Sequence, residues 1–146
     1  GLGAGAAWNN AAYPAASFRA DMGYNYTDNW AVEVGTLGVT QSGSGLNQSM
    51  QFYDLSVKGT LPLGDMIALF AQVGGAYASP GSIGSPAAGG LTVGQLQAGW
   101  DFFSAAGIQM NVTKQVSLNL TDYFYYGAPN PQGNTDIVLA GIKYDF

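Results

Sequence analysis

Strict alternation between two kinds of residue constrains this chain more than any other feature. From Ala16 to Tyr26, apolar residues occupy the even positions and polar or very small residues occupy the odd positions, without a slip. A period of two places successive side chains on opposite faces of an extended strand. The length of this segment also suits a membrane, because a tilted strand needs about 9–11 residues to cross one. The segment is therefore predicted to be a membrane-spanning β-strand.

The same alternation recurs along the chain and predicts eight strands. The other alternating segments are residues 1–8, 30–35, 53–58, 67–77, 100–112, 116–121 and 138–146. Short turns are expected at 27–29, 61–65 and 113–115, and longer loops at 38–49, 79–98 and 127–134, with residues 91–97 able to extend a strand. Alternating short and long connections are typical of a membrane barrel with short periplasmic turns and longer extracellular loops. This rhythm places both chain ends on the periplasmic side.

Composition favours a barrel over other membrane or soluble folds. Only 9% of the residues are charged, against about 25% in soluble domains, and no apolar run reaches the roughly 18 residues of a transmembrane helix. Lipid leaves every backbone polar group to be paired within the protein, which a closed barrel achieves. The prediction is therefore an all-β fold, an eight-stranded up-and-down antiparallel transmembrane barrel, with residues 1–146 as a single domain in the bacterial outer membrane.

The polar face of the strands is assigned to the barrel interior. In a soluble lipocalin-like barrel, the remote alternative, this face would meet water, and its seven strand charges would be a sparse coat. Inside a narrow lumen, three positive and four negative side chains can pair with one another. The predicted interior polar network is Arg19, Asp21, Glu33, Asp54, Lys58, Gln72, Gln109, Asn119, Lys143 and Asp145.

Aromatic residues gather near the predicted strand ends, where they are expected to form belts at the two membrane interfaces. The predicted interfacial aromatics are Trp8, Tyr24, Tyr26, Trp30, Tyr53, Tyr77, Trp100, Tyr123, Tyr125, Tyr144 and Phe146. Near Asp122 the alternation loses its phase, which admits a β-bulge. Asp101, Asp122 and Asp136 are expected near outer strand ends, solvated or facing lipopolysaccharide cations.

Three segments and the C-terminal strand resemble the OmpA-like outer-membrane barrel family. They are residues 18–35, 55–77, 107–123 and 141–146. The resemblance implies a small barrel with an interior of charge pairs and water, for which Arg19, Glu33, Lys58 and Lys143 are the candidates here. It also implies that Phe146 is a terminal aromatic signal read by the outer-membrane assembly machinery. The first strand looks clipped, and no peptidoglycan-binding domain follows the last strand, so a cell-wall tether is not expected.

Other motifs favour no catalytic or cofactor site. Asp21, Glu33, Asp54 and Asp145 could be read as a carboxylate cluster for a metal or for acid–base work, but charge pairing in a lumen is the better interpretation. The glycines of residues 1–5 lack the βαβ context of a nucleotide-binding loop. The chain has no cysteine and no histidine, which excludes thiolate metal sites and histidine-activated nucleophiles. We therefore expect no enzyme activity, no cofactor and no bound metal.

The expected function is structural, with the extracellular loops available to another envelope protein. The alternative is a narrow, low-conductance pore, because eight strands leave room mainly for side chains. Outer-membrane lipid and lipopolysaccharide are the expected surroundings. Nucleic acid is not expected as a partner, since the net charge is -5.

Overall fold

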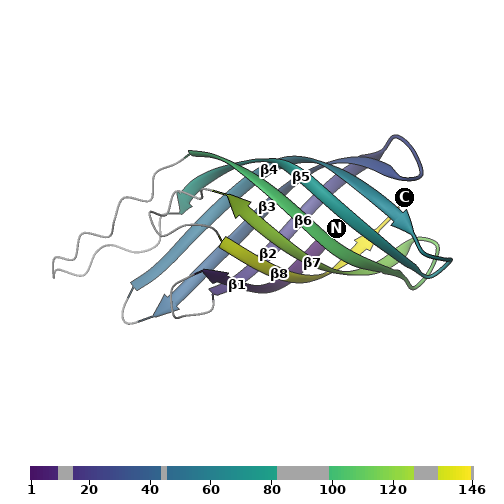
Figure 1. Ribbon diagram of the computed structural model, residues 1–146. Helices are drawn as coiled ribbons and strands as arrows, with labels where there is room; N and C mark the ends of the chain where they lie inside the picture. The colour runs from purple at the N-terminus through teal and green to yellow at the C-terminus, as the bar shows by residue number, and fades with distance from the viewer. Residues whose placement is uncertain (10–14, 44–45, 82–98, 127–134, 146) are drawn as a thin grey trace.

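Eight antiparallel strands form a closed barrel in the computed structural model, which describes residues 1–9, 15–43, 46–81, 99–126 and 135–145 (Figure 1). The strands are β1 (Leu2–Asn9), β2 (Ala15–Asn25), β3 (Trp30–Gly43), β4 (Leu46–Pro62), β5 (Ile67–Gly81), β6 (Gly99–Asn111), β7 (Val116–Tyr126) and β8 (Thr135–Tyr144). Each strand pairs with the next one, and β1 also pairs with β8, which closes the barrel. The predicted strand number and topology are confirmed.

No helix in the described part of the chain is long and apolar enough to cross a membrane.

Both chain ends lie at one end of the barrel, together with the three short turns at 26–29, 63–66 and 112–115 (Figure 1). We call this the turn end and the opposite end the loop end. Threonine hydroxyls close two of the turns, because Thr27 Oγ1 accepts from the Trp30 amide at 3.0 Å and Thr113 Oγ1 accepts from the Val116 amide at 2.9 Å. Such side-chain bonds satisfy backbone donors where the strand ladder stops. Outer-membrane barrels have short turns on the periplasmic side and longer loops on the extracellular side, so the turn end faces the periplasm.

The predicted loop at 38–49 is wrong. β3 continues to Gly43 and β4 begins at Leu46, with these two residues paired. Residues of low β-propensity are held extended here because the backbone ladder of the hairpin continues through them. Similarly, residues 79–81 belong to β5, whereas residues 82–98, including the alternating stretch 91–97, and residues 127–134 lie outside the described residues.

No bulge interrupts β7 near Asp122. Thr121, Asp122 and Tyr123 pair in unbroken succession with Leu139, Val138 and Ile137 of β8. The phase looked unclear in the sequence because a carboxylate occupies the outward face of this strand while two tyrosines occupy the inward face.

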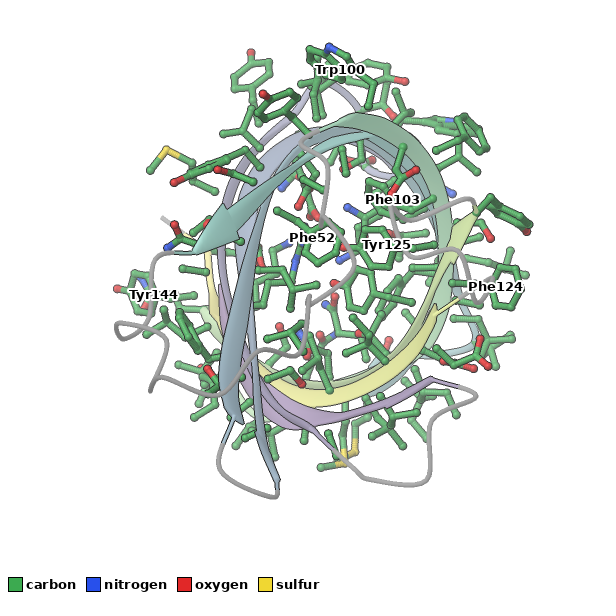
Figure 2. All side chains as sticks on the ribbon, turned by 90° about the vertical axis from the view of Figure 1, so that its left-hand side faces the viewer. Phe52, Trp100, Phe103, Phe124, Tyr125 and Tyr144 are labelled. Atoms are coloured by element: carbon green, nitrogen blue, oxygen red, sulfur yellow. The ribbon has the colours of Figure 1, made fainter. Side chains whose placement is uncertain are left out.

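Large side chains cover the outside of the barrel, and a second set fills its interior (Figure 2). Met22, Tyr24 and Trp100 are each more than 70% exposed, at 73%, 74% and 80%. An exposed apolar surface around a whole barrel suits lipid as the surrounding solvent.

Aromatic rings lie over glycines on neighbouring strands. In four directly paired positions a ring faces a glycine: Phe18 with Gly38, Trp30 with Gly59, Phe70 with Gly107, and Phe103 with Gly74. The rings cover backbone that has no side chain of its own, a device that stabilises glycines within sheets. At Gly107 the space is particularly restricted, because an added Cβ would overlap the Phe70 ring and lie 2.5 Å from the Leu120 carbonyl oxygen.

We expect Gly107→Ala to lower the free energy of unfolding by about 1–3 kcal/mol, as overpacking does elsewhere. Urea unfolding in lipid vesicles, followed by tryptophan fluorescence, measures this change. The matched control is Gly75→Ala, whose added Cβ would meet only the Asp101 carbonyl oxygen at 3.9 Å. Equal effects of the two substitutions would contradict the ring-over-glycine account.

Candidate functional site

The candidate site is the barrel interior, and its most enclosed polar contact is an ion pair between Arg19 and Asp54. Arg19 Nη1 and Nη2 donate to the two Asp54 carboxylate oxygens at 2.6 and 2.8 Å, and both residues are buried. The two strands that carry them, β2 and β4, are separated by β3, so the side chains must meet across it. Gly35 of β3 leaves that room, because a Cβ there would lie 2.5 Å from Arg19 Nη2. This forked geometry is the strongest form of a carboxylate–guanidinium contact.

A second buried pair joins Glu33 of β3 to Lys58 of β4. Lys58 Nζ lies 3.5 Å from Glu33 Oε1 and 4.1 Å from the centre of the Phe70 ring. Gln72 of β5 donates to Glu33 Oε2 at 3.2 Å and to Ser56 Oγ at 2.5 Å. Both charges are therefore held by further polar or aromatic groups, as buried charges must be.

Towards the turn end the charged side chains of the interior are more exposed. Asp21 lies 3.2 Å from the N-terminal ammonium and 3.6 Å from Arg19 Nε, and Lys143 Nζ lies 2.9 Å from Asp145 Oδ1. An open cavity of about 750 Å³ is lined here by Lys143, Asp145 and Gln109, among others. Gln109 donates to Asn111 at 3.0 Å, and Asn119 is half-buried against Gly141.

The ten predicted interior residues do not form a single network. Arg19 and Asp54 form one pair and Lys58 and Glu33 another, while Lys143 pairs with Asp145 nearer the opening. The four carboxylates that could be read as a cluster each have a cationic partner. No group of residues able to hold a metal ion occurs in the described part of the chain.

Towards the loop end the interior is mostly apolar, apart from the inward carboxylate of Asp101, and the sequence pattern was not interpreted in this way. A plug of packed side chains fills this end of the interior, and we name it the aromatic plug: Leu37, Phe52, Phe103, Tyr125, Ile137 and Leu139. The Tyr125 ring lies 4.8 Å from that of Phe52 and stacks on that of Phe103 at 5.3 Å. Figure 2 shows these three rings inside the ring of strands, whereas Trp100, Phe124 and Tyr144 point outward. The alternation within β4 already indicated this, since Phe52 is two residues from Asp54 and therefore lies on the same, inward face of the strand.

The prediction that Tyr123 and Tyr125 belong to the interfacial belt is therefore wrong. Both are buried in the lumen, and the Tyr123 ring lies 4.8 Å from the Arg19 guanidinium carbon. This contact joins the ion pairs to the aromatic plug. A tyrosine cluster at a strand end suggested an interface, but the unbroken register of β7 turns alternate members inward.

The other predicted belt aromatics face outward wherever the structure describes them. Tyr53, Tyr77 and Trp100 pair across β4, β5 and β6 near the loop end, with 5.5 Å between the rings of Tyr77 and Trp100. Tyr24, Tyr26, Trp30 and Tyr144 are exposed near the turn end. The Trp8 side chain and Phe146 lie outside the part of the protein that the structure describes.

The three aspartates predicted at outer strand ends differ in their environments. Asp136 is exposed at the second position of β8, as expected. Asp101 points inward and is buried, and Asp122 lies on the outward face of β7, four residues before its end at Tyr126. Asp122 is thus farther into the membrane-spanning surface than the sequence analysis placed it.

Comparison with known proteins agrees with this architecture. Residues 4–145 match the OmpA-like transmembrane domain. The chain belongs to this family. Its members' location and the barrel itself place the protein in the bacterial outer membrane. No curated protein matches the chain in sequence.

Solved outer-membrane proteins share the fold at low sequence identity. Neisserial surface protein A superimposes with a TM-score of 0.71 at 13% identity, covering 99% of this chain and 93% of that one. Ail, the attachment invasion locus protein of Yersinia pestis, gives 0.62 at 11% identity, with 100% and 94% covered. The outer-membrane enzyme PagL gives 0.58 at 13% identity, with 99% of each chain covered.

We expect Asp54→Asn to lower the free energy of unfolding by about 3–5 kcal/mol, because it removes the forked carboxylate partner of the buried Arg19 and leaves only the more distant Asp21, 3.6 Å from Arg19 Nε. Urea unfolding in lipid vesicles measures the loss. The double variant Arg19→Met, Asp54→Leu should recover most of it, since both charges of this pair are then removed together. Asp145→Asn is the control, and its more exposed pair should contribute about 1 kcal/mol or less. A small effect of Asp54→Asn would contradict the account.

Proposed function

We propose that this barrel is a non-conducting, non-catalytic membrane anchor that holds its extracellular connections in place for contact with a partner. The observation that carries the proposal is the aromatic plug. It lies on the loop-end side of the ion pairs, and plug and ion pairs together fill the lumen at two levels. With the interior closed, the extracellular connections are the parts available to other molecules.

The plug argues against the narrow-pore alternative. A rearrangement of the Arg19, Glu33, Lys58 and Lys143 charges would open only the polar half of the lumen. Phe52, Phe103 and Tyr125 are at most 2% exposed and contact one another above it. An ion would have to cross this apolar layer without its hydration shell, which is costly in a low-dielectric environment.

The polar groups of the interior also argue against catalysis. A reacting carboxylate needs access to substrate and a suitable proton partner, but Glu33 and Asp54 are buried in ion pairs. The chain has no histidine to activate a nucleophile. The likeness to PagL is one of fold, and it transfers no activity to this chain.

The charge distribution favours an uncharged protein surface as the partner of the extracellular connections. The four basic residues are Arg19, Lys58, Lys114 and Lys143, and none belongs to a loop-end connection. Ail has been solved with the heparin analogue sucrose octasulfate, but a polyanion would find no cation at the loop end of this barrel. Here β3 and β4 instead project a paired hairpin as far as Gly43 and Leu46, well past the paired Tyr53 and Tyr77.

Two further partners are proposed, one for assembly of the barrel and one in the membrane around it. The terminal Phe146 is proposed as the signal for the outer-membrane assembly machinery, as the family resemblance implies, and lipopolysaccharide as the lipid of the outer leaflet.

In planar lipid bilayers we expect no ion channels from the wild-type barrel and none from Glu33→Ala, because the plug remains closed. Adding Phe52→Ala, Phe103→Ala and Tyr125→Ala to Glu33→Ala should produce measurable conductance. Insertion is verified by the faster migration of the unheated barrel on a gel.

Steady wild-type channels whose size changes in Glu33→Ala would overturn the anchor and establish the pore. Arg19→Ala serves as the second polar variant, and it should likewise remain silent. In vesicles that contain lipopolysaccharide and the wild-type barrel, release of fatty acid from lipopolysaccharide would overturn the non-catalytic part of the proposal.

A further inference from the structure

Among the described residues, one charged side chain lies well inside the membrane-spanning part of the lipid-facing surface, Asp122 of β7. It lies four residues from Tyr126 and six from Val116, the ends of its strand. At about 3.3 Å per residue along a tilted strand, this is roughly 10 Å below the level of Tyr126. Its neighbours on the same face of β7 are Leu120 and Phe124, and directly across it lie Ala106 and Val138. The carboxylate is thus surrounded by apolar groups.

No hydrogen bond or ion pair satisfies Asp122 within the described residues. Outward hydroxyls exist on the neighbouring strands, but Ser104 and Tyr126 bond to each other at 3.0 Å. An ionisable side chain that faces lipid without a partner is costly, and such residues generally mark a functional contact. The missing partner must therefore come from outside this chain.

A row of mostly small side chains, flanked by larger ones, leads to this carboxylate, and we call this row the groove. One row of directly paired outward positions runs through Gly59, Ala71, Ala106, Asp122 and Val138 across five strands. Larger side chains flank it, with Leu69, Ile108 and Leu120 forming the paired row on one side. At Gly59 and Ala71 the groove borders an apolar hollow of about 390 Å³ beside Trp30. Small residues allow another protein surface to approach closely within a membrane.

We propose that this groove is a lateral docking surface for another outer-membrane barrel that presents a lysine or arginine on its own lipid-facing side. Charge complementarity selects this occupant over a second copy of the chain. Of the four basic residues, Arg19 and Lys58 are buried in the lumen, and Lys143 and Lys114 line the cavity at the turn end. A second copy would bring a second carboxylate to this depth and no cation. The proposal concerns a surface that the anchor function does not use.

The test mixes two forms of the barrel in lipid vesicles, with Asp122→Lys as the defined cationic probe. The chain has no cysteine, so Gln115→Cys in an exposed turn provides one site for donor or acceptor dyes. We expect the wild-type and Asp122→Lys mixture to associate at least about tenfold more tightly, by energy transfer, than either form alone. Ala106→Phe in the wild-type member should fill the groove and abolish most of this gain, whereas Val34→Phe on the opposite side should not.

The matched control places the same two charges on the opposite side of the barrel. One form carries Val34→Asp and Asp122→Asn, and it is mixed with a second form that carries Val34→Lys and Asp122→Asn. Equal association of this pair would overturn the proposal, since the groove would then add nothing. If the wild-type barrel associates with itself as tightly as the mixture does, the proposal is overturned in favour of a homodimer. If no mixture associates, the proposal is overturned and the groove is an ordinary lipid-facing surface. If Asp122→Lys fails to fold on the heat-modifiability gel, Ala106→Lys with Asp122→Asn brings the cation to the adjacent position.

Discussion

Backbone hydrogen bonding in a medium without water is the constraint on which this structure depends. Each strand N–H and C=O must find its partner within the protein, so the sheet has to close through the pairing of β1 with β8. Closure of only eight strands then leaves a lumen no wider than a few side chains. The inward side chains must therefore fill most of this space, and the charges among them are costly unless they are paired.

The interior meets this demand in two layers with different physics. The lower layer is electrostatic, with Arg19–Asp54 and Lys58–Glu33 as separate pairs supported by Gln72 and the Phe70 ring. The upper layer is apolar, with Phe52, Phe103 and Tyr125 packed ring to ring. Tyr123, whose ring faces the Arg19 guanidinium and packs in the apolar cluster, links the two. This two-layer filling supports the proposal that the barrel does not conduct and acts as a scaffold whose outer surfaces carry its interactions.

Glycine and alanine determine how closely other groups approach on both faces. Inside, Gly35 leaves room for Arg19 to reach Asp54 across a strand. Outside, Ala71 and Ala106 form the floor of the groove that leads to Asp122. Lipid would accept larger side chains at these outward positions, so a small-residue groove ending at an unpaired carboxylate is better explained by a protein neighbour than by the bilayer alone.

Local sequence determined the strands, their inward and outward faces and the short turns, because period-two alternation is a property of each strand by itself. It also indicated which charges share the lumen. It could not determine which charge meets which, since Arg19 and Asp54 are brought together only by the stagger of three strands around a closed barrel. The same holds for the extension of β3 and β4 beyond residue 38 and for the row that joins Gly59 to Asp122. Each depends on register between strands, which is decided by the closure of the whole sheet.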